Sequence, residues 1–273
     1  MTRISITAHY TEVAGIRTFY ETNDSAQNSV IVCLHSEGRE TRQFHEVMEA
    51  LAPEYRVIAF DMPAHGKTWP VNGTQPITDW TAYVDFAWKF METMHLQDAI
   101  VMGCGLGAAV AFSLARKHPV KGIVTIGGAD NTQTEINDAL INHPHISTPH
   151  MMLEYNDSIT GRDAGQSARE LIRWQTWCEA AITTKADLQM LCTLDQRQEI
   201  GQISCPVLML RGEDDWVSDQ EMSEAAFGRL TTANKQLITF SHTGRFVMLE
   251  QPRKTARAIH NFFATSKNGG NHK

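Results

Sequence analysis

Apolar residues recur along this chain in short continuous runs, and segments with helical spacing lie between those runs. Near the start, residues 4–12 and 16–21 are β-prone and flank Ala14-Gly15, which predicts a β-hairpin. Further runs have the length of buried strands, at residues 29–34, 56–60, 99–102, 121–126, 206–210 and 235–240. Continuous apolar runs of this length are typical of a parallel sheet that is covered on both faces.

Helical periodicity fills the intervals between these runs. Apolar residues from Phe44 to Leu51 share one face of a predicted helix, and Thr78 is the predicted N-cap of a long helix that reaches Met94. Further helices are predicted at residues 106–116, 221–230 and 254–263. Strands that alternate with helices imply right-handed crossovers, so the pattern predicts an α/β fold with a mainly parallel sheet and helices on both faces.

The alternation is interrupted between residues 131 and 189. This stretch begins with loop-like sequence and continues with helical segments rich in Met, Trp and Leu, which predicts an inserted cap or lid. We therefore expect an α/β core built from residues 1–130 and 190–266, a helical cap from 131–189, and a flexible polar tail from 267–273. The apolar side chains of the cap are candidates for plain core or for the lining of an apolar ligand pocket.

Composition narrows the class of protein. The chain has 273 residues, of which 42% are hydrophobic and 20% charged, as is ordinary for a globular protein. A formal net charge of -7 argues against a broad nucleic-acid interface. No apolar run approaches the roughly 18 residues of a membrane span, and residues 1–6 lack the apolar segment of a signal peptide. We expect a cytoplasmic protein that binds neither nucleic acid nor membrane.

The cysteines support the same compartment. Their number is odd and none forms a CxxC pair; they are Cys33, Cys104, Cys178, Cys192 and Cys205. Most lie in apolar runs, which predicts reduced and buried thiols.

Five short segments in a fixed order resemble the α/β-hydrolase superfamily across nearly the whole chain. They are Leu34-His35, residues 61–66, residues 103–107, residues 212–215, and Gly244 with Glu250-Gln251-Pro252. The resemblance implies an α/β-hydrolase fold with an oxyanion loop, a nucleophile elbow of the form Gly-x-nucleophile-x-Gly, a catalytic acid and a histidine loop. Because such folds host many activities, each site residue needs its own argument.

Two positions of this frame hold residues that cannot perform the chemistry. Gly105 stands at the nucleophile position and has no side chain that attacks a substrate. Arg245 stands at the histidine position, and a guanidinium with a pKa above about 12 is no general base near neutral pH. Since the loss of one triad member typically costs about 10⁴ to 10⁶ in kcat, conventional serine-hydrolase activity is not expected. The neighbouring Cys104 is interpreted as a small buried residue beside the turn.

Asp215 stands at the position of the catalytic acid, with Asp214 as the alternative register. Two opposed roles follow for Arg245. It forms a structural latch with Asp215 in place of the catalytic pair, or it points into the pocket and anchors a carboxylate or phosphate of a ligand. We favour the latch, because a partly buried aspartate without a partner is costly.

Two further side chains are candidate bases. His242 lies three residues before Arg245 on the same predicted loop, and Glu37 lies in the predicted oxyanion loop. The backbone N–H groups of Leu106 and of the loop near Ser36 are candidate oxyanion donors, with Cys104 beside them as a candidate contact to a substrate.

No metal or cofactor is expected. His143, His145 and His150 form the one histidine cluster, but they are separated by prolines and lack an HExxH pattern. Neither GxGxxG after a strand nor GxxxxGK[ST] occurs, so nothing indicates a nucleotide.

Three hypotheses for function remain open. The first is a non-hydrolytic enzyme that promotes a lyase or isomerase-type proton transfer on a small, largely apolar carbonyl compound, with Asp215, His242 or Glu37 as catalytic groups. The second is an inactive pseudo-hydrolase that binds a small molecule or regulates a partner. The third is an active-site variant of a hydrolase in which Gly105 is an introduced substitution. The sequence leaves open whether the protein turns over a substrate, and it indicates no oligomeric state.

Overall fold

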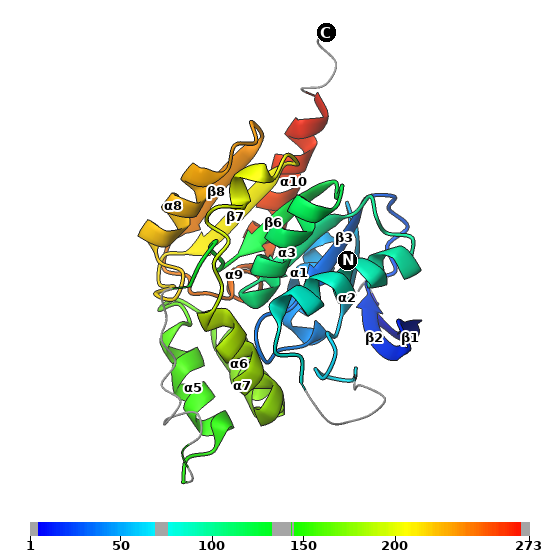
Figure 1. Cartoon of the computed structure of the whole chain (residues 1–273). Coiled ribbons are helices and arrows are strands. Elements are labelled where there is room, and N and C mark those ends of the chain that lie inside the picture. The colour runs from blue at the N-terminus through cyan, green and yellow to red at the C-terminus, as the bar shows by residue number, and fades with distance from the viewer. Residues whose placement is uncertain (1–4, 69–75, 133–142, 144, 269–273) are drawn as a thin grey trace.

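The computed structural model describes residues 5–68, 76–132, 143 and 145–268, and an eight-stranded sheet forms its centre (Figure 1). The strand order is β1-β2-β4-β3-β5-β6-β7-β8. The strands are β1 (Thr7–Val13), β2 (Ile16–Thr22), β3 (Val30–Leu34), β4 (Arg56–Phe60), β5 (Ile100–Cys104), β6 (Gly122–Ile126), β7 (Val207–Gly212) and β8 (Lys235–Phe240). The pairs from β4 through β8 are parallel, whereas β1 with β2 and β2 with β4 are antiparallel. The α/β-hydrolase fold and the N-terminal hairpin expected from the sequence are therefore confirmed.

Burial explains the pattern of the strands. Every residue of β5, β6 and β7 is buried, which accounts for their uninterrupted apolar sequence. The edge strands β1 and β8 are mostly exposed or half-buried, because the core clusters cover them less completely.

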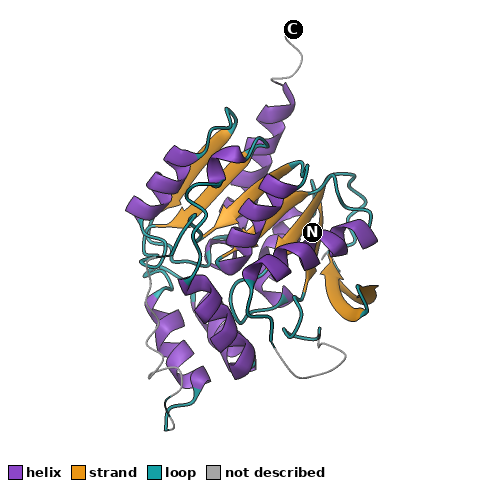
Figure 2. Cartoon of the chain, viewed as in Figure 1, coloured by secondary structure: helices purple, strands orange, loops and turns teal. Residues whose placement is uncertain are grey.

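Helices cover both faces of the sheet (Figure 2). One core cluster joins the sheet to α2 (Trp80–Thr93), α3 (Leu106–Lys117) and α8 (Gln220–Arg229). A second cluster joins the opposite face to α1 (His45–Leu51), α9 (Val247–Glu250) and α10 (Pro252–Asn268). The two clusters put an apolar layer on each face, as the alternation of strands and helices predicted.

Some boundaries differ from the sequence predictions. The N-cap of α2 is Asp79, not Thr78, since its carboxylate accepts a hydrogen bond from the Thr81 N–H. Helix α10 continues to Asn268, so residues 267 and 268 of the expected tail are helical, and residues 269–273 lie outside the described part. The prediction of buried thiols is wrong for Cys178, which ends a cap helix and is exposed, and Cys192 and Cys205 are half-buried.

The cap consists, in the described residues, of α5 (Thr148–Ser158), α6 (Gln166–Cys178) and α7 (Ala181–Cys192). Figure 1 shows these helices grouped at one end of the sheet. Residues 133–142 and 144 of the segment expected to form the cap lie outside the described residues.

A buried aspartate on α7 joins the cap to the core. The Asp187 carboxylate accepts hydrogen bonds from the backbone N–H of Gly38 at 2.8 Å, from His65 Nε2 at 2.8 Å and from the Tyr83 hydroxyl at 2.9 Å. Gly38 and His65 belong to loops that follow β3 and β4, so this contact holds the cap over the carboxyl ends of the parallel strands.

The partners of His65 define its charge. Its Nδ1 lies 3.1 Å from the Pro63 carbonyl and its Nε2 lies 2.8 Å from Asp187, and both oxygens are acceptors. Both ring nitrogens must therefore carry hydrogen, so His65 is an imidazolium cation. Burial by itself would lower the pKa of His65, but the Asp187 carboxylate, the Pro63 carbonyl and the charge of Asp61 together raise it.

His35 has the opposite character. Its Nδ1 donates to the Ser36 carbonyl, and its Nε2 accepts from the Met62 N–H, which fixes a neutral tautomer. Burial, followed by repulsion from the charged His65 ring 4.7 Å away, lowers the pKa of His35 to about 3.

Removal of the Asp187 charge is expected to loosen the cap. Asp187→Asn leaves the His65 cation without its buried counter-charge, so the free energy of unfolding falls by about 3 kcal/mol in urea titrations. The control is Asp98→Asn, since Asp98 is exposed and 3.9 Å from Lys121, and it changes stability by less than about 0.5 kcal/mol. Equal effects of the two substitutions would contradict a structural role for the Asp187 contact.

The neutral state of His35 predicts a loss of stability in acid. Below the unfolded pKa of about 6.5, the unfolded chain binds a proton at residue 35 that the folded chain does not bind until about pH 3. Between pH 6 and pH 4, the wild type should therefore lose roughly 1 kcal/mol more per pH unit than His35→Gln, whose side chain does not titrate. Urea titrations across this window check the difference in slope, and parallel curves for the two proteins would rule out the assignment.

Candidate active site

The segment that resembles a nucleophile elbow forms a tight turn between β5 and α3. Gly105 has φ 55° and ψ -120°, a conformation that residues with side chains rarely adopt. A Cβ on Gly103 would overlap the Gly107 carbonyl, so the backbone of the strand and that of the helix approach each other closely here. This geometry presents residue 105 at the carboxyl end of the sheet.

The carboxylate of Glu37 occupies the space above this turn. Its Oε2 accepts a hydrogen bond from the Leu106 N–H at 3.1 Å. A Cβ added to Gly105 would overlap the same oxygen and would lie 3.0 Å from Arg245 Nη2. Glu37 therefore fills the place that a side chain at residue 105 would take.

The second expected oxyanion donor is also occupied. The N–H of Ser36 donates to Gln43 Oε1 at 2.9 Å. Both donors predicted for the oxyanion hole, Leu106 and Ser36, are thus bonded to side chains of this chain in the structure.

Arg245 lies between two carboxylates. Its Nη1 is 3.4 Å from Asp215 Oδ2 and its Nη2 is 3.4 Å from Glu37 Oε1, while Nη1 also donates to the Ser218 hydroxyl at 3.2 Å. Only 1% of the Arg245 side chain is exposed. Burial alone would lower the pKa of Arg245, but Glu37 and Asp215 raise it, so the guanidinium stays charged. The contact with Asp215 is the one expected of a latch, and Glu37 adds a second carboxylate to it.

The structure separates the two register alternatives for the acid. Asp215 is buried, and its Oδ1 accepts from the N–H groups of Val217 and Ser218. Asp214 instead pairs with Arg162 near the surface, at 3.3 Å. Asp215 is thus the aspartate that the fold brings to Arg245.

His242 lies away from this cluster. Its side chain is 52% exposed, with Nδ1 2.8 Å from Asp163 and Nε2 4.0 Å from Glu213. The residue has φ 55°, which places it on a turn before Gly244. The structure brings Asp215, Glu37, Gly105 and Arg245 together and does not bring His242 to them.

Cys104 is fully buried beside the elbow. Its sulfur lies 3.9 Å from Gln43 Nε2, and burial raises the pKa of the thiol, which keeps it protonated. A protonated, buried thiol is a poor nucleophile, in keeping with its interpretation as a packing residue.

The histidines and two tryptophans of the cap were considered as site residues. No group of three His, Cys, Asp or Glu side chains among the described residues is placed to hold a metal ion. Trp174 and Trp177 are 44% and 52% exposed, so these two cap residues face solvent and neither fills a core nor lines an apolar pocket. In the described part of the chain, no helix is both long and apolar enough to cross a membrane.

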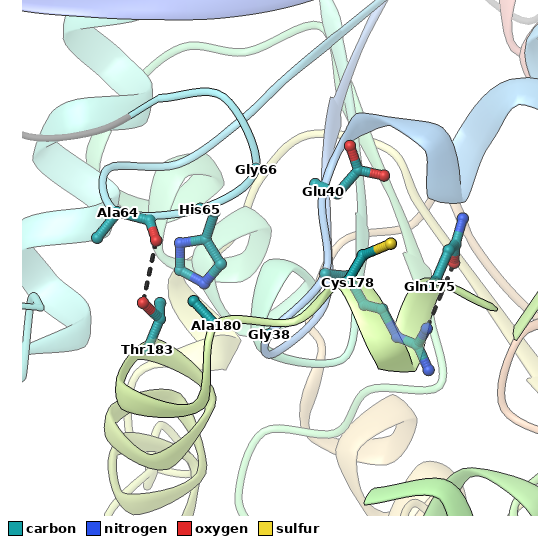
Figure 3. A pocket seen from close by; sticks show the side chains of 10 residues that line it. Gly38, Glu40, Ala64, His65, Gly66, Gln175, Cys178, Ala180 and Thr183 are labelled. Atoms are coloured by element: carbon teal, nitrogen blue, oxygen red, sulfur yellow. Dashed lines mark hydrogen bonds between the residues drawn. The ribbon is translucent and has the colours of Figure 1, made fainter. Parts of the chain in front are cut away.

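Two small cavities lie near the carboxyl ends of the strands. The cavity beside Gly105 and Arg245 has about 10 Å³, which is room for roughly one water molecule. The second has about 40 Å³ and lies between the cap and the core (Figure 3). It is lined by Gly38, Arg39, Glu40, Ala64, His65, Gly66, Gln175, Cys178, Ala180 and Thr183.

The sequence analysis did not single out the residues that hold the cap, among them Arg39, Gln175 and Asp187. Arg39 Nε lies 3.2 Å from Glu179, and Arg39 Nη2 lies 3.2 Å from Thr176 on α6. The one available signal was His65, which stands in a quoted segment of the superfamily pattern.

Comparison with known proteins agrees with this architecture. The family Hydrolase_4, described as "Serine aminopeptidase, S33", matches residues 25–250. The (E)-2-((N-methylformamido)methylene)succinate hydrolase of Acinetobacter baylyi is 25% identical over 272 residues, with 95% of each chain covered.

Solved structures show the same fold. The enol-lactonase from Burkholderia xenovorans superimposes with a TM-score of 0.83 at 15% identity, over 94% of this chain and 100% of that one. A thermophilic esterase from Thermogutta terrifontis gives 0.81 at 18% identity, over 95% and 98%. At these identities the likeness concerns the fold alone. From the family match and the shared architecture together, the chain belongs to the serine aminopeptidase S33 family (Hydrolase_4) of the α/β-hydrolase superfamily.

Proposed function

We propose that this chain is a pseudo-hydrolase: an α/β-hydrolase-fold protein with a degenerate triad that binds a small molecule and does not hydrolyse esters or amides. Gly105 takes the nucleophile position and Arg245 the histidine position. The observation that carries the proposal is the Glu37 carboxylate, which overlaps the place of a residue 105 side chain while bonded to Leu106 and Arg245.

The chemistry of acyl transfer requires three parts that are missing or blocked at this site. A nucleophile needs a side chain, a general base needs a titratable group near neutral pH, and the oxyanion needs free N–H donors. Gly105 and Arg245 supply neither of the first two, and Glu37 already accepts from Leu106. A fixed carboxylate at that donor also repels a developing oxyanion.

Proton transfer by a lyase or isomerase has less support than binding. A general base must reach the substrate within hydrogen-bond distance and must be free to accept the proton. Glu37 is 4% exposed and paired with Arg245, and His242 is bonded to Asp163 at the surface. These contacts therefore favour the pseudo-hydrolase over a non-hydrolytic enzyme of the lyase or isomerase type. The similar proteins named above are hydrolytic enzymes, which is consistent with descent of this chain from an active hydrolase.

Rebuilding the triad tests this proposal. Wild type and Gly105→Ser should resist a fluorophosphonate probe, because Gly105→Ser lacks a base and meets Glu37. The triple variant Gly105→Ser/Glu37→Ala/Arg245→His restores a nucleophile, space and a base beside Asp215. It should label with the probe and hydrolyse p-nitrophenyl acetate above background.

Adding Asp215→Asn to the triple variant is the control, and it should cut the gained activity sharply. Labelling of the wild type by the fluorophosphonate would overturn the proposal. A folded triple variant without any activity would contradict the assignment of residues 105, 215 and 245 to the triad positions.

The buried cation should be coupled to its carboxylates. Arg245→Met leaves Glu37 and Asp215 facing each other without a counter-charge, so unfolding free energy falls by about 3–5 kcal/mol. Glu37→Gln added to Arg245→Met removes one of the two negative charges. In a double-mutant cycle, the double variant should be at least about 1 kcal/mol more stable than the sum of the two single effects predicts. Arg197→Met, at an exposed pair with Asp195, is the matched control and should leave stability almost unchanged, because water screens this pair. Strictly additive effects at residues 37 and 245 would contradict the coupling.

A further inference from the structure

The 40 Å³ cavity between cap and core is separate from the cavity at Gly105, since the two share no lining residue. Its walls come from the core loops around Gly38 and Gly66 and from the cap at α6 and the start of α7. Figure 3 shows Glu40, Cys178 and Gln175 on one side of it, and Ala64, His65 and Thr183 on the other. Anything bound here contacts both parts of the molecule.

Gln175 offers this cavity an unsatisfied donor. The residue is 3% exposed, and its Oε1 faces Arg39 Nη1 at 3.5 Å, which fixes the orientation of the amide because a guanidinium only donates. Its Nε2 has no hydrogen-bond partner. A buried N–H without a partner is unfavourable, so the position favours a ligand atom that accepts a hydrogen bond.

The cationic groups in the lining are already matched to acceptors. Arg39 is bonded to the Ile172 carbonyl and to Thr176, and it pairs with Glu179. His65 has an acceptor on each ring nitrogen. An anionic ligand would therefore find no unmatched cation among the lining side chains that the structure describes.

Glu40 supplies the complementary acceptor. Its carboxylate pairs with Arg42 and Lys67 and is 6% exposed. A carboxylate has about four lone-pair sites, so Glu40 retains capacity for another donor while it repels an anion. A donor from Gln175 and an acceptor from Glu40 together suit a neutral group that both accepts and donates.

We propose that this cavity is the ligand site of the binding function and that it takes a small neutral molecule bearing a primary amide group. The carbonyl oxygen accepts from Gln175 Nε2, and the amide N–H₂ donates to Glu40. A volume of 40 Å³ holds roughly three water molecules, which is the size of one amide group. Further atoms of a larger ligand extend past the exposed Cys178. This inference rests on the proposed function, whose own test at Gly105 is independent of it.

Acetamide and its anionic isostere acetate are the probes, and the thiol of Cys178 is the reporter. The rate at which Cys178 reacts with Ellman's reagent is followed by peptide mass spectrometry. Acetamide at about ten times its Kd should slow that reaction roughly tenfold, with acetate giving no protection. Gln175→Met keeps the size of the side chain and removes the donor, so it should weaken acetamide binding roughly tenfold.

Gln166→Met is the matched control, because Gln166 is exposed on the same helix and bonded to Glu170, and it should leave protection unchanged. Protection by acetate equal to that by acetamide, full protection in Gln175→Met, or no protection by acetamide would each overturn the site. Crystals soaked in acetamide that show only water in the cavity would do the same. Fluorophosphonate labelling of the wild type would refute the pseudo-hydrolase proposal, whereas failure of acetamide alone would refute only this site.

Discussion

The centre of the molecule depends on one buried cation held between two carboxylates. Arg245 is 3.4 Å from both Glu37 and Asp215, and all three side chains are at most 4% exposed. Charges removed from water are tolerated only when their partners remain, so each member of the set requires the others. Glu37 also requires the glycine at 105, because a side chain there would overlap its carboxylate. Glycine, acid and cation thus form one interdependent unit.

The turn at Gly105 persists for reasons of packing that are independent of catalysis. Cβ atoms on Gly103 and Gly107 would overlap the backbone of α3 and of Leu34, so these glycines let β5, α3 and β3 approach one another. Gly105 adopts its positive φ without the strain that a nucleophile would carry there. A chain under selection for the fold alone would retain this turn, which is why an intact elbow does not establish hydrolysis.

The strands could be predicted from the sequence because a strand that is buried on both faces consists of a continuous run of apolar residues. Residues 56–60 and 235–240 coincide with β4 and β8, and the other strand boundaries shift by a few residues. Motif spacing also singled out Gly105, Arg245 and Asp215, and the structure places these three residues close together. The cap attachments were beyond reach, since Gly38 and Asp187 are 149 residues apart and no local pattern records their contact. The outward position of His242 likewise depends on tertiary contacts with Asp163 and Glu213.

Four consecutive residues connect the closed centre to the cap. The Ser36 N–H is held by Gln43, and the Glu37 carboxylate faces inward to Leu106 and Arg245. The next two residues are buried against the cap, with the Gly38 N–H bonded to Asp187 of α7 and Arg39 paired with Glu179. In a hydrolase this loop would supply an oxyanion donor and leave space for a substrate. Here every polar group named on it is bonded within the protein. The residues that contact the cap therefore directly follow, in the chain, the residue that fills the space beside Gly105.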